Sequence, residues 1–132
     1  MSLSIFLDEH IEACRIAYEK TGIKPKVHVK IDTGMNRIGV RPENAAEFIK
    51  QVQKCDFIEL EGIFTHFACA EDEKATKNQY EKFRKVVDSV DSTGLLIHCC
   101  NTPALIAYDY MDYNMARVGI GIYACSRICP QA

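Results

Sequence analysis

The sequence predicts a parallel α/β fold of the (β/α) TIM-barrel type, of which the 132 residues supply only the second half, about four βα units. Short apolar runs alternate with segments of helical periodicity, so crossover helices join the strands and neighbouring strands must be parallel. The first such run is not followed by Gly-x-Gly-x-x-Gly, which argues against a doubly wound nucleotide-binding sheet. A whole barrel needs eight strands and about 250 residues.

The first predicted element is a helix. Phe6, Ile11 and Cys14 share one side of residues 4–19 at helical spacing, and a Thr-Gly pair that follows is typical of a helix end. Residues 26–31 then alternate between apolar and polar side chains and form the first predicted strand.

The next two units repeat this order. Pro42 is placed for the first turn of a helix over 42–54, and an apolar strand follows over 57–64. Residues 71–90 carry an apolar stripe at helical spacing, and residues 95–99 form the third predicted strand.

The last unit is a short helix that begins near residue 101 and a fourth strand over 115–123. Glycines at 119 and 121 would let a ligand approach the backbone of that strand.

The composition describes one ordinary soluble domain or part of one. With 48% hydrophobic residues, 26% charged residues and a net charge of -2, neither a nucleic-acid nor a membrane partner is expected. No apolar run reaches the roughly 20 residues of a membrane span, and charges come too early for a signal peptide, so a cytoplasmic location is expected. The seven cysteines include no Cys-x-x-Cys pair, so no disulfide framework or metal site is predicted, and Cys125 and Cys129 are expected to be free thiols.

Polar side chains follow each predicted strand, at the end where barrel enzymes carry their chemistry. Asn101 or Thr102 can cap the helix that Pro103 begins, and the free N–H groups of such a helix suit a phosphate. The candidate residues in chain order are Lys30, Asp32, Arg37, His66, Asn101, Thr102, Arg117 and the glycines that follow it.

Arg117 is a charge within an apolar stretch, and burial without a partner would cost several kcal/mol, so a partner is expected. A structural salt bridge would meet the same need, and Thr102 could be only a helix cap. His28 and His98 are expected to be hydrogen-bonded structural residues.

Four motifs together resemble the alanine racemases that use pyridoxal phosphate. The likeness runs from about residue 24 to residue 123 and keeps the family's order. It implies the second half of that family's N-terminal barrel as one partial domain over 1–132, with the C-terminal β domain absent. The motifs are Lys30-Ile-Asp-Thr-Gly-Met-Asn-Arg-Ile-Gly, Gly62-Ile-Phe-Thr-His-Phe-Ala, His98-Cys-Cys-Asn-Thr-Pro-Ala and Arg117-Val-Gly-Ile-Gly-Ile-Tyr.

The resemblance also implies roles around a pyridoxal 5'-phosphate cofactor. Arg117 matches the arginine that donates to the pyridine nitrogen, which then stays unprotonated because a guanidinium has no acceptor. His66 matches the histidine near that arginine. Arg37 matches the arginine that binds the phenolic oxygen and the substrate carboxylate. Lys30 matches a lysine that is often carbamylated, a change that would turn its repulsion from Arg37 into attraction.

The phosphate contacts implied by the resemblance come from the last two motifs. They involve Asn101, Thr102 in place of the family's usual serine, and the backbone of Gly119 and Ile120.

The implied family reaction is an isomerisation that interconverts L-alanine and D-alanine and so supplies D-alanine for peptidoglycan precursors. The family's Schiff-base lysine lies in a Lys-Ala-x-Ala-Tyr-Gly motif that this sequence lacks, and its tyrosine base comes from the C-terminal domain of a partner subunit. The chain alone is therefore expected to be inactive.

Two other functions stay open at the level of sequence. One is a related racemase of serine or other small amino acids. The other is a barrel protein that holds pyridoxal phosphate without catalysis. Open strand edges predict in each case a homo-oligomer or association with the missing half of the barrel.

Overall fold

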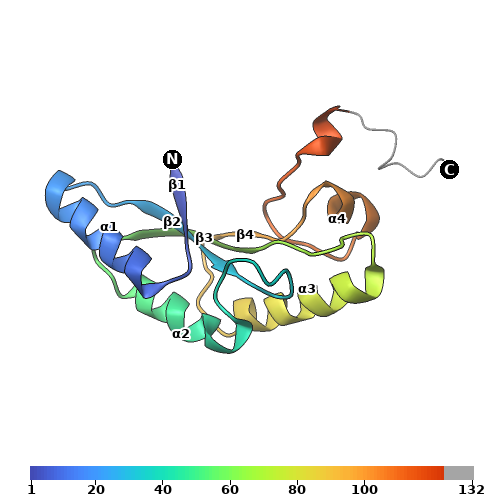
Figure 1. Ribbon diagram of the computed structural model, residues 1–132, viewed down its shortest axis with the longest axis horizontal. Helices are drawn as coiled ribbons and strands as arrows, with labels where there is room; N and C mark the ends of the chain where they lie inside the picture. Colours follow the sequence, from blue (N-terminus) through green and yellow to red (C-terminus); the bar gives the residue numbers. More distant parts are fainter. Residues whose placement is uncertain (124–132) are drawn as a thin grey trace.

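The computed structural model describes residues 1–123, which form a four-stranded parallel sheet with helices between the strands (Figure 1). The order of strands in the sheet is β1-β2-β3-β4, the order of the chain. The parallel α/β prediction is confirmed, while Cys125 and Cys129 lie outside the described residues. The elements are β1 (Ser2–Ile5), α1 (Asp8–Thr21), β2 (Lys26–Ile31), α2 (Pro42–Gln53), β3 (Glu59–Thr65), α3 (Glu73–Asp88), β4 (Leu96–His98), α4 (Thr102–Ala107) and the 3-10 helix η1 (Ile120–Tyr123).

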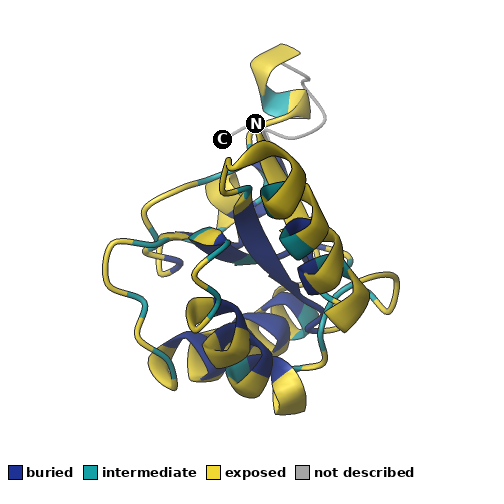
Figure 2. Cartoon of the chain, turned by 90° about the vertical axis from the view of Figure 1, so that its left-hand side faces the viewer, coloured by how far each residue is buried: buried dark blue, intermediate teal, exposed yellow. Residues whose placement is uncertain are grey.

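The core lies between the sheet and its crossover helices. Val27, Val29 and Ile31 alternate along β2 and are 0% exposed. Helices α2 and α3 lie side by side beneath the sheet, and their outward surfaces are exposed while the central strands are buried (Figures 1 and 2). Because strand side chains alternate, His28 and Lys30 point to the opposite face, which is free to carry polar groups.

The N-terminal prediction was wrong in part. The helix was predicted to begin at residue 4, but residues 2–5 form β1 and α1 begins only at Asp8. The reason is tertiary, because β1 pairs in parallel with β2 from Ser2 opposite Lys26 to Ile5 opposite Val29. The predicted helix end holds, since Gly22 has a left-handed φ of 69° and its N–H donates to Tyr18 at 2.7 Å.

The predicted fourth strand over 115–123 was also wrong. Arg117 N–H donates to the Cys100 carbonyl at 3.0 Å, but residues 120–123 turn into η1. Ile122 N–H then bonds locally to the Gly119 carbonyl at 3.1 Å. This segment meets the sheet on one side only, so the second row of ladder bonds that would keep it extended is missing. The sheet still has four strands, because β1, which was not predicted, makes up the number.

Candidate cofactor site

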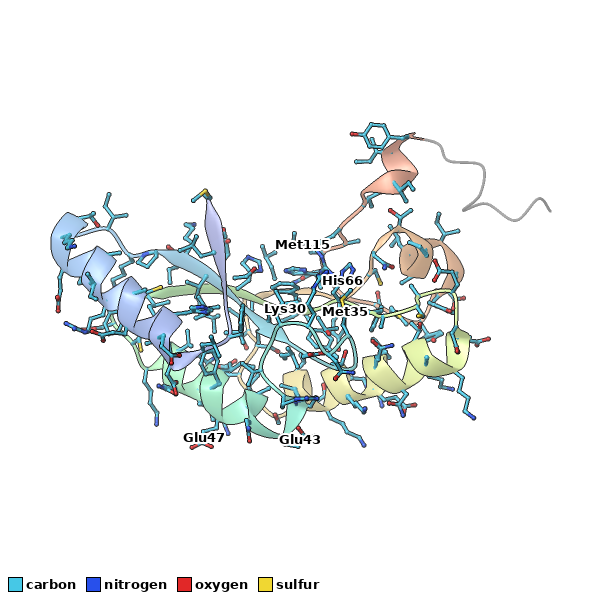
Figure 3. All side chains as sticks on the ribbon, in the orientation of Figure 1. Lys30, Met35, Glu43, Glu47, His66 and Met115 are labelled. Atoms are coloured by element: carbon cyan, nitrogen blue, oxygen red, sulfur yellow. The ribbon has the colours of Figure 1, made fainter. Side chains whose placement is uncertain are left out.

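The predicted polar residues meet at the carboxyl ends of the strands. Lys30 lies near the end of β2, His66 directly follows β3, and His98 ends β4. Figure 3 shows Lys30 and His66 over the same central part of the sheet. Their proximity has an electrostatic effect, because the charge of Lys30 contributes to lowering the pKa of His66.

Arg117 is held by neutral acceptors. Its Nη2 donates to the Thr65 carbonyl at 2.8 Å and lies 3.4 Å from His66 Nδ1, and its Nη1 contacts His98 Nδ1. The guanidinium also lies 5.1 Å from the centre of the Phe64 ring, within cation–π range. The expected partner therefore exists, but among residues 1–123 no carboxylate forms a salt bridge with Arg117, so the structural salt bridge is not formed.

Both histidines beside Arg117 are poor bases. Burial lowers the pKa of His66, and the charges of Arg117, Lys30 and Arg37 lower it further. Burial and the Arg117 charge lower the pKa of His98 to about 3. At neutral pH each ring is uncharged and can accept a hydrogen bond from the guanidinium.

Lys30 is 3% exposed, and its Nζ donates to the Ile38 carbonyl at 2.8 Å. Burial lowers its pKa, with Asp32 acting in the opposite direction and Arg37 and Arg117 adding to the decrease. Arg37 itself lies on the exposed part of the loop after β2. The structure thus brings Lys30, His66 and Arg117 together, while Arg37 acts on them through its charge.

Asp32 shapes the loop that carries Arg37. Its Oδ1 accepts from Gly34 N–H at 3.2 Å and from Asn36 N–H at 3.0 Å. Burial would raise the pKa of Asp32, but these backbone donors and the Lys30 charge together lower it. Gly39 has a φ of 131°, and a Cβ there would lie 2.7 Å from Asp32 N, so the loop can return to β2 only at a glycine.

The residues predicted to bind phosphate have two different roles in the structure. Asn101 is the cap of α4, because its side chain accepts from Ala104 N–H at 3.1 Å. Thr102 is not the cap. Its buried Oγ1 instead accepts from Gly119 N–H at 3.1 Å and from Gly121 N–H at 3.3 Å, whereas Ile120 lies at the start of η1. Thr102 keeps its own hydroxyl proton to donate.

One relevant group was missed by the sequence reasoning. Glu61 Oε2 lies 3.0 Å from His28 Nε2, and His28 Nδ1 lies 2.8 Å from His98 Nε2. His28 and His98 are hydrogen-bonded as expected, but they form a line that leads to Arg117. The available signal was the two-residue spacing of His28 and Lys30, which places both on the face away from the helices.

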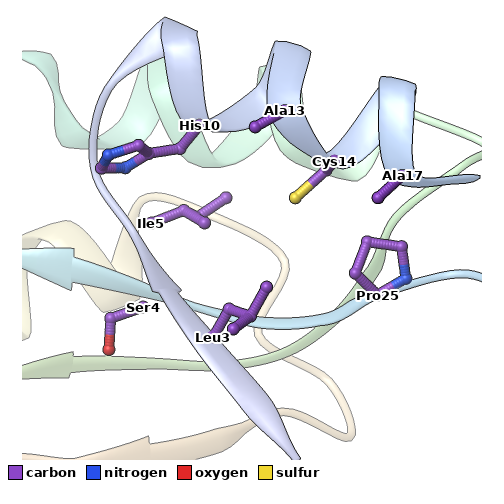
Figure 4. Close-up of a pocket in the computed structure, with 8 residues that line it drawn as sticks. All are labelled: Leu3, Ser4, Ile5, His10, Ala13, Cys14, Ala17 and Pro25. Atoms are coloured by element: carbon purple, nitrogen blue, oxygen red, sulfur yellow. The ribbon is translucent and has the colours of Figure 1, made fainter.

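An apolar pocket of about 250 Å³ lies away from this site, between β1 and α1 (Figure 4). Carbon-rich side chains and the Cys14 thiol surround it, and it has no cluster of charged groups. Its lining consists of Leu3, Ser4, Ile5, His10, Ala13, Cys14, Ala17 and Pro25.

The donor set suits an anionic ligand. Among the described residues, the carboxylate of Asp32 lies near enough to Lys30 to affect its pKa, but its charge is already directed at backbone N–H groups, while Lys30, Arg37 and Arg117 are all cationic. Such an excess of cationic donors suits phosphate and phenolate oxygens. Within residues 1–123 no group of three metal-ligating side chains is present, and no helix is long and apolar enough to cross a membrane.

Comparison with known proteins gives one consistent result. Residues 1–127 match the family model described as alanine racemase, N-terminal domain. Alanine racemase 1 of Oceanobacillus iheyensis is 36% identical over 129 residues, covering 93% of this chain and 34% of the relative. The alanine racemase of Desulfovibrio desulfuricans is 39% identical over 134 residues, covering 96% of this chain and 36% of the relative.

Solved structures agree with these relatives. The alanine racemase of Clostridium difficile 630 superposes with a TM-score of 0.83 at 35% identity and covers 93% of this chain and 33% of that one. The Bacillus anthracis alanine racemase with bound L-Ala-P gives a TM-score of 0.78 at 30% identity, over 95% of this chain and 34% of that one. The chain therefore spans about a third of the length of the proteins it matches.

Proposed function

The chain belongs to the alanine racemase family through its N-terminal domain, and on this basis we propose that it supplies the cofactor ring, phosphate and carboxylate contacts of a pyridoxal-phosphate-dependent alanine racemase. The observation that carries the proposal is the Arg117 guanidinium, which neutral acceptors hold in place and no carboxylate neutralises among the described residues. The relatives' names support alanine as the substrate.

Arg117 would face the pyridine nitrogen of the cofactor. Pyridoxal phosphate supplies, when bound, an electron-withdrawing ring that stabilises the charge left when an α-proton is removed. Arg117 can only donate to the ring nitrogen, so that nitrogen would stay unprotonated. His66 supports this arrangement as an uncharged neighbour 3.4 Å from the guanidinium.

The remaining residues would hold the anionic groups. Thr102 would donate its hydroxyl proton to the phosphate, with the backbone of Gly119 and Ile120 and the Asn101 end of α4 beside it. Arg37 would bind the phenolic oxygen and the substrate carboxylate, and Lys30 would support Arg37. These assignments rest on the matched motifs and on the cationic excess of the site.

The 132 residues contain no Lys-Ala-x-Ala-Tyr-Gly segment, the motif that carries the family's Schiff-base lysine. We therefore propose that these 132 residues alone bind the cofactor without racemising alanine. The open edge of β1 supports the further proposal that the chain associates with a second copy or with the remainder of a barrel.

The test is to measure, by equilibrium dialysis, the affinity of the chain for pyridoxal 5'-phosphate. Arg117→Gln should weaken binding roughly tenfold to hundredfold, the effect of losing a charged hydrogen-bond donor. Arg84→Gln removes an exposed arginine from α3 and serves as the matched control. Equal affinity in both variants would contradict the proposal.

Chemical reduction provides a second test. After incubation with pyridoxal 5'-phosphate and borohydride, the intact mass should show no stoichiometric adduct, because the motif that carries the family's Schiff-base lysine does not occur in this sequence. A single adduct on one lysine would instead show a cofactor lysine within this chain.

A further inference from the structure

Glu61, His28, His98 and Arg117 form one continuous line of hydrogen bonds across three strands. Glu61 Oε2 lies 3.0 Å from His28 Nε2 at one end. His28 Nδ1 lies 2.8 Å from His98 Nε2 in the middle, and His98 Nδ1 contacts Arg117 Nη1 at the other end. The line connects the partly exposed Glu61 to the buried side of the candidate cofactor site.

The chemistry of the two ends fixes the direction of every bond. A guanidinium has donors only, so His98 Nδ1 must accept from Arg117 and His98 carries its proton on Nε2. That proton is donated to His28 Nδ1, which leaves the His28 proton on Nε2 to be donated to Glu61. A carboxylate only accepts, so the line ends there without conflict.

Burial and charge favour this single arrangement. His28 is 8% and His98 is 3% exposed, so water cannot easily replace either bond. Burial, Arg117 and His28 lower the pKa of His98, which keeps its ring uncharged. A hydrogen bond from the Ser2 hydroxyl and one from His28, together with the Lys26 charge, outweigh burial and lower the pKa of Glu61, so its carboxylate is charged. Lys26 Nζ lies 3.6 Å from Glu61 Oε1.

The backbone of β3 is adapted to the line. The pairing of β2 with β3 shifts by one residue, because Val27 pairs with Leu60 but His28 pairs with Gly62. Glu61 is the extra residue of this bulge, and such an irregularity re-aims a side chain that regular alternation would place elsewhere. A Cβ on Gly62 would lie 2.6 Å from His28 Nδ1, so only glycine leaves space for the ring.

An aromatic ring holds the far end of the line. Phe64 stacks on His98 with ring centres 4.9 Å apart and an interplanar angle of 7°, and it also lies beneath the Arg117 guanidinium. His98 is thus fixed by Phe64 on its face, by His28 on one nitrogen and by Arg117 on the other.

We propose that Glu61, His28 and His98 are positioning residues that form a one-way hydrogen-bond relay and orient the guanidinium of Arg117. The relay transmits the polarity of the Glu61 carboxylate to Arg117, whose free donors then point to the cofactor ring. Only the orientation of Arg117 toward the cofactor ring rests on the proposed function, since the relay itself is a property of the chain without cofactor.

The test is nitrogen-15 NMR of the imidazole rings, recorded on the chain without pyridoxal phosphate. Protonated and unprotonated ring nitrogens have well-separated shifts, and the chain has four histidines to assign. At pH 7, His98 should be neutral, and both His28 and His98 should carry a proton on Nε2 and accept a hydrogen bond at Nδ1. A proton on Nδ1 of either ring, or a charged His98, would overturn the proposal without any variant and without bearing on cofactor binding.

Variants at the carboxylate end test transmission along the line. Glu61→Gln keeps an oxygen that accepts from His28 and should leave both tautomers unchanged. Glu61→Lys puts a donor there, so His28 should move its proton to Nδ1 and the nitrogen shifts of His98 and of the Arg117 side chain should follow. Glu59→Lys is the matched control, because Glu59 also pairs with Lys26, at 3.1 Å, but lies outside the relay.

The outcomes are distinct. Unmoved His98 shifts in a folded Glu61→Lys chain, or equal shifts in Glu61→Lys and Glu59→Lys, would refute the relay. If the relay is refuted but Arg117→Gln still weakens cofactor binding, the proposed function stands alone.

Discussion

The Lys30 side chain donates to the Ile38 carbonyl at 2.8 Å, from beneath the loop that carries Arg37. This bond fixes the amine in one position while burial lowers its pKa. Lys30 therefore combines a defined position with an increased fraction of neutral, nucleophilic amine.

We expect Lys30 to react with carbon dioxide. The neutral amine would form a carbamate and release a proton, which replaces a cation near Arg37 and Arg117 with an anion. Carbon-13 NMR with labelled bicarbonate at mildly alkaline pH should show a carbamate signal that Lys30→Met abolishes. Lys50→Met, which removes an exposed lysine of α2, should retain it. A signal that survives Lys30→Met would assign the carbamate elsewhere.

We expect the free energy of unfolding to fall as the pH is lowered from about 6.5 to about 4.5. The pKa values of His66 and His98 are lower in the folded chain than the usual value of about 6.5, so the unfolded chain binds more protons in this range. Each histidine can contribute up to about 1.4 kcal/mol per pH unit. Urea titrations at several pH values measure this slope, and a flat profile would contradict it.

We expect Gly62→Ala to destabilise the chain by about 1–3 kcal/mol, as overpacking does. The new Cβ would meet the Leu96 carbonyl at 2.4 Å and His28 Nδ1 at 2.6 Å. Gly119→Ala is the control, because a Cβ there meets nothing within 4 Å, and its effect should stay within about 0.5 kcal/mol. Urea midpoints that shift equally in both variants would show that the His28 ring tolerates a side chain at Gly62.

We expect Thr102→Val to release the segment after Arg117 from α4. Valine keeps the shape of threonine but loses the oxygen that accepts from Gly119 and Gly121. A net hydrogen bond of about 0.5–1.5 kcal/mol predicts roughly twofold to tenfold faster amide exchange at these glycines. Thr102→Ser should restore slow exchange. Equal protection in the valine variant would mean that these bonds do not hold the segment.

We expect the chain to form a dimer or larger assembly in solution. Leu3 lies on the edge strand β1 and is 42% exposed beside the apolar pocket against α1. Leu3→Lys should shift light scattering toward the monomer because a charge blunts an open edge. Ile23→Lys changes an exposed apolar residue away from the strands and should have no such effect. A clean monomer of the unmodified chain over a wide dilution range would contradict the prediction.

The sequence predicted well those elements whose signals are local. β2 occupies residues 26–31 as expected, because strict alternation determines it. β1 was missed because the parallel contact with β2 defines it, and the helical spacing of the following residues extends into it. The 115–123 strand was wrong because its residues are apolar but pair on one side only.

The same distinction between local signals and tertiary contacts applies to the candidate site. Lys30, His66 and Arg117 could be grouped because residues that follow parallel strands meet at one edge of the sheet. Glu61 could not be found in this way, since only a one-residue shift of pairing brings its carboxylate to His28. Thr102 was singled out correctly, but its bonds to Gly119 and Gly121 depend on a turn that the sequence pattern did not predict.

The agreement between strand order and chain order has a consequence for biosynthesis. Each strand after the first pairs with the strand made just before it, so during translation its partner has already been synthesised. No strand has to wait for a distant segment, and every loop to be closed stays short. The sheet can therefore grow one unit at a time from its N-terminal edge, and Arg117 docks last onto histidines that are already in place.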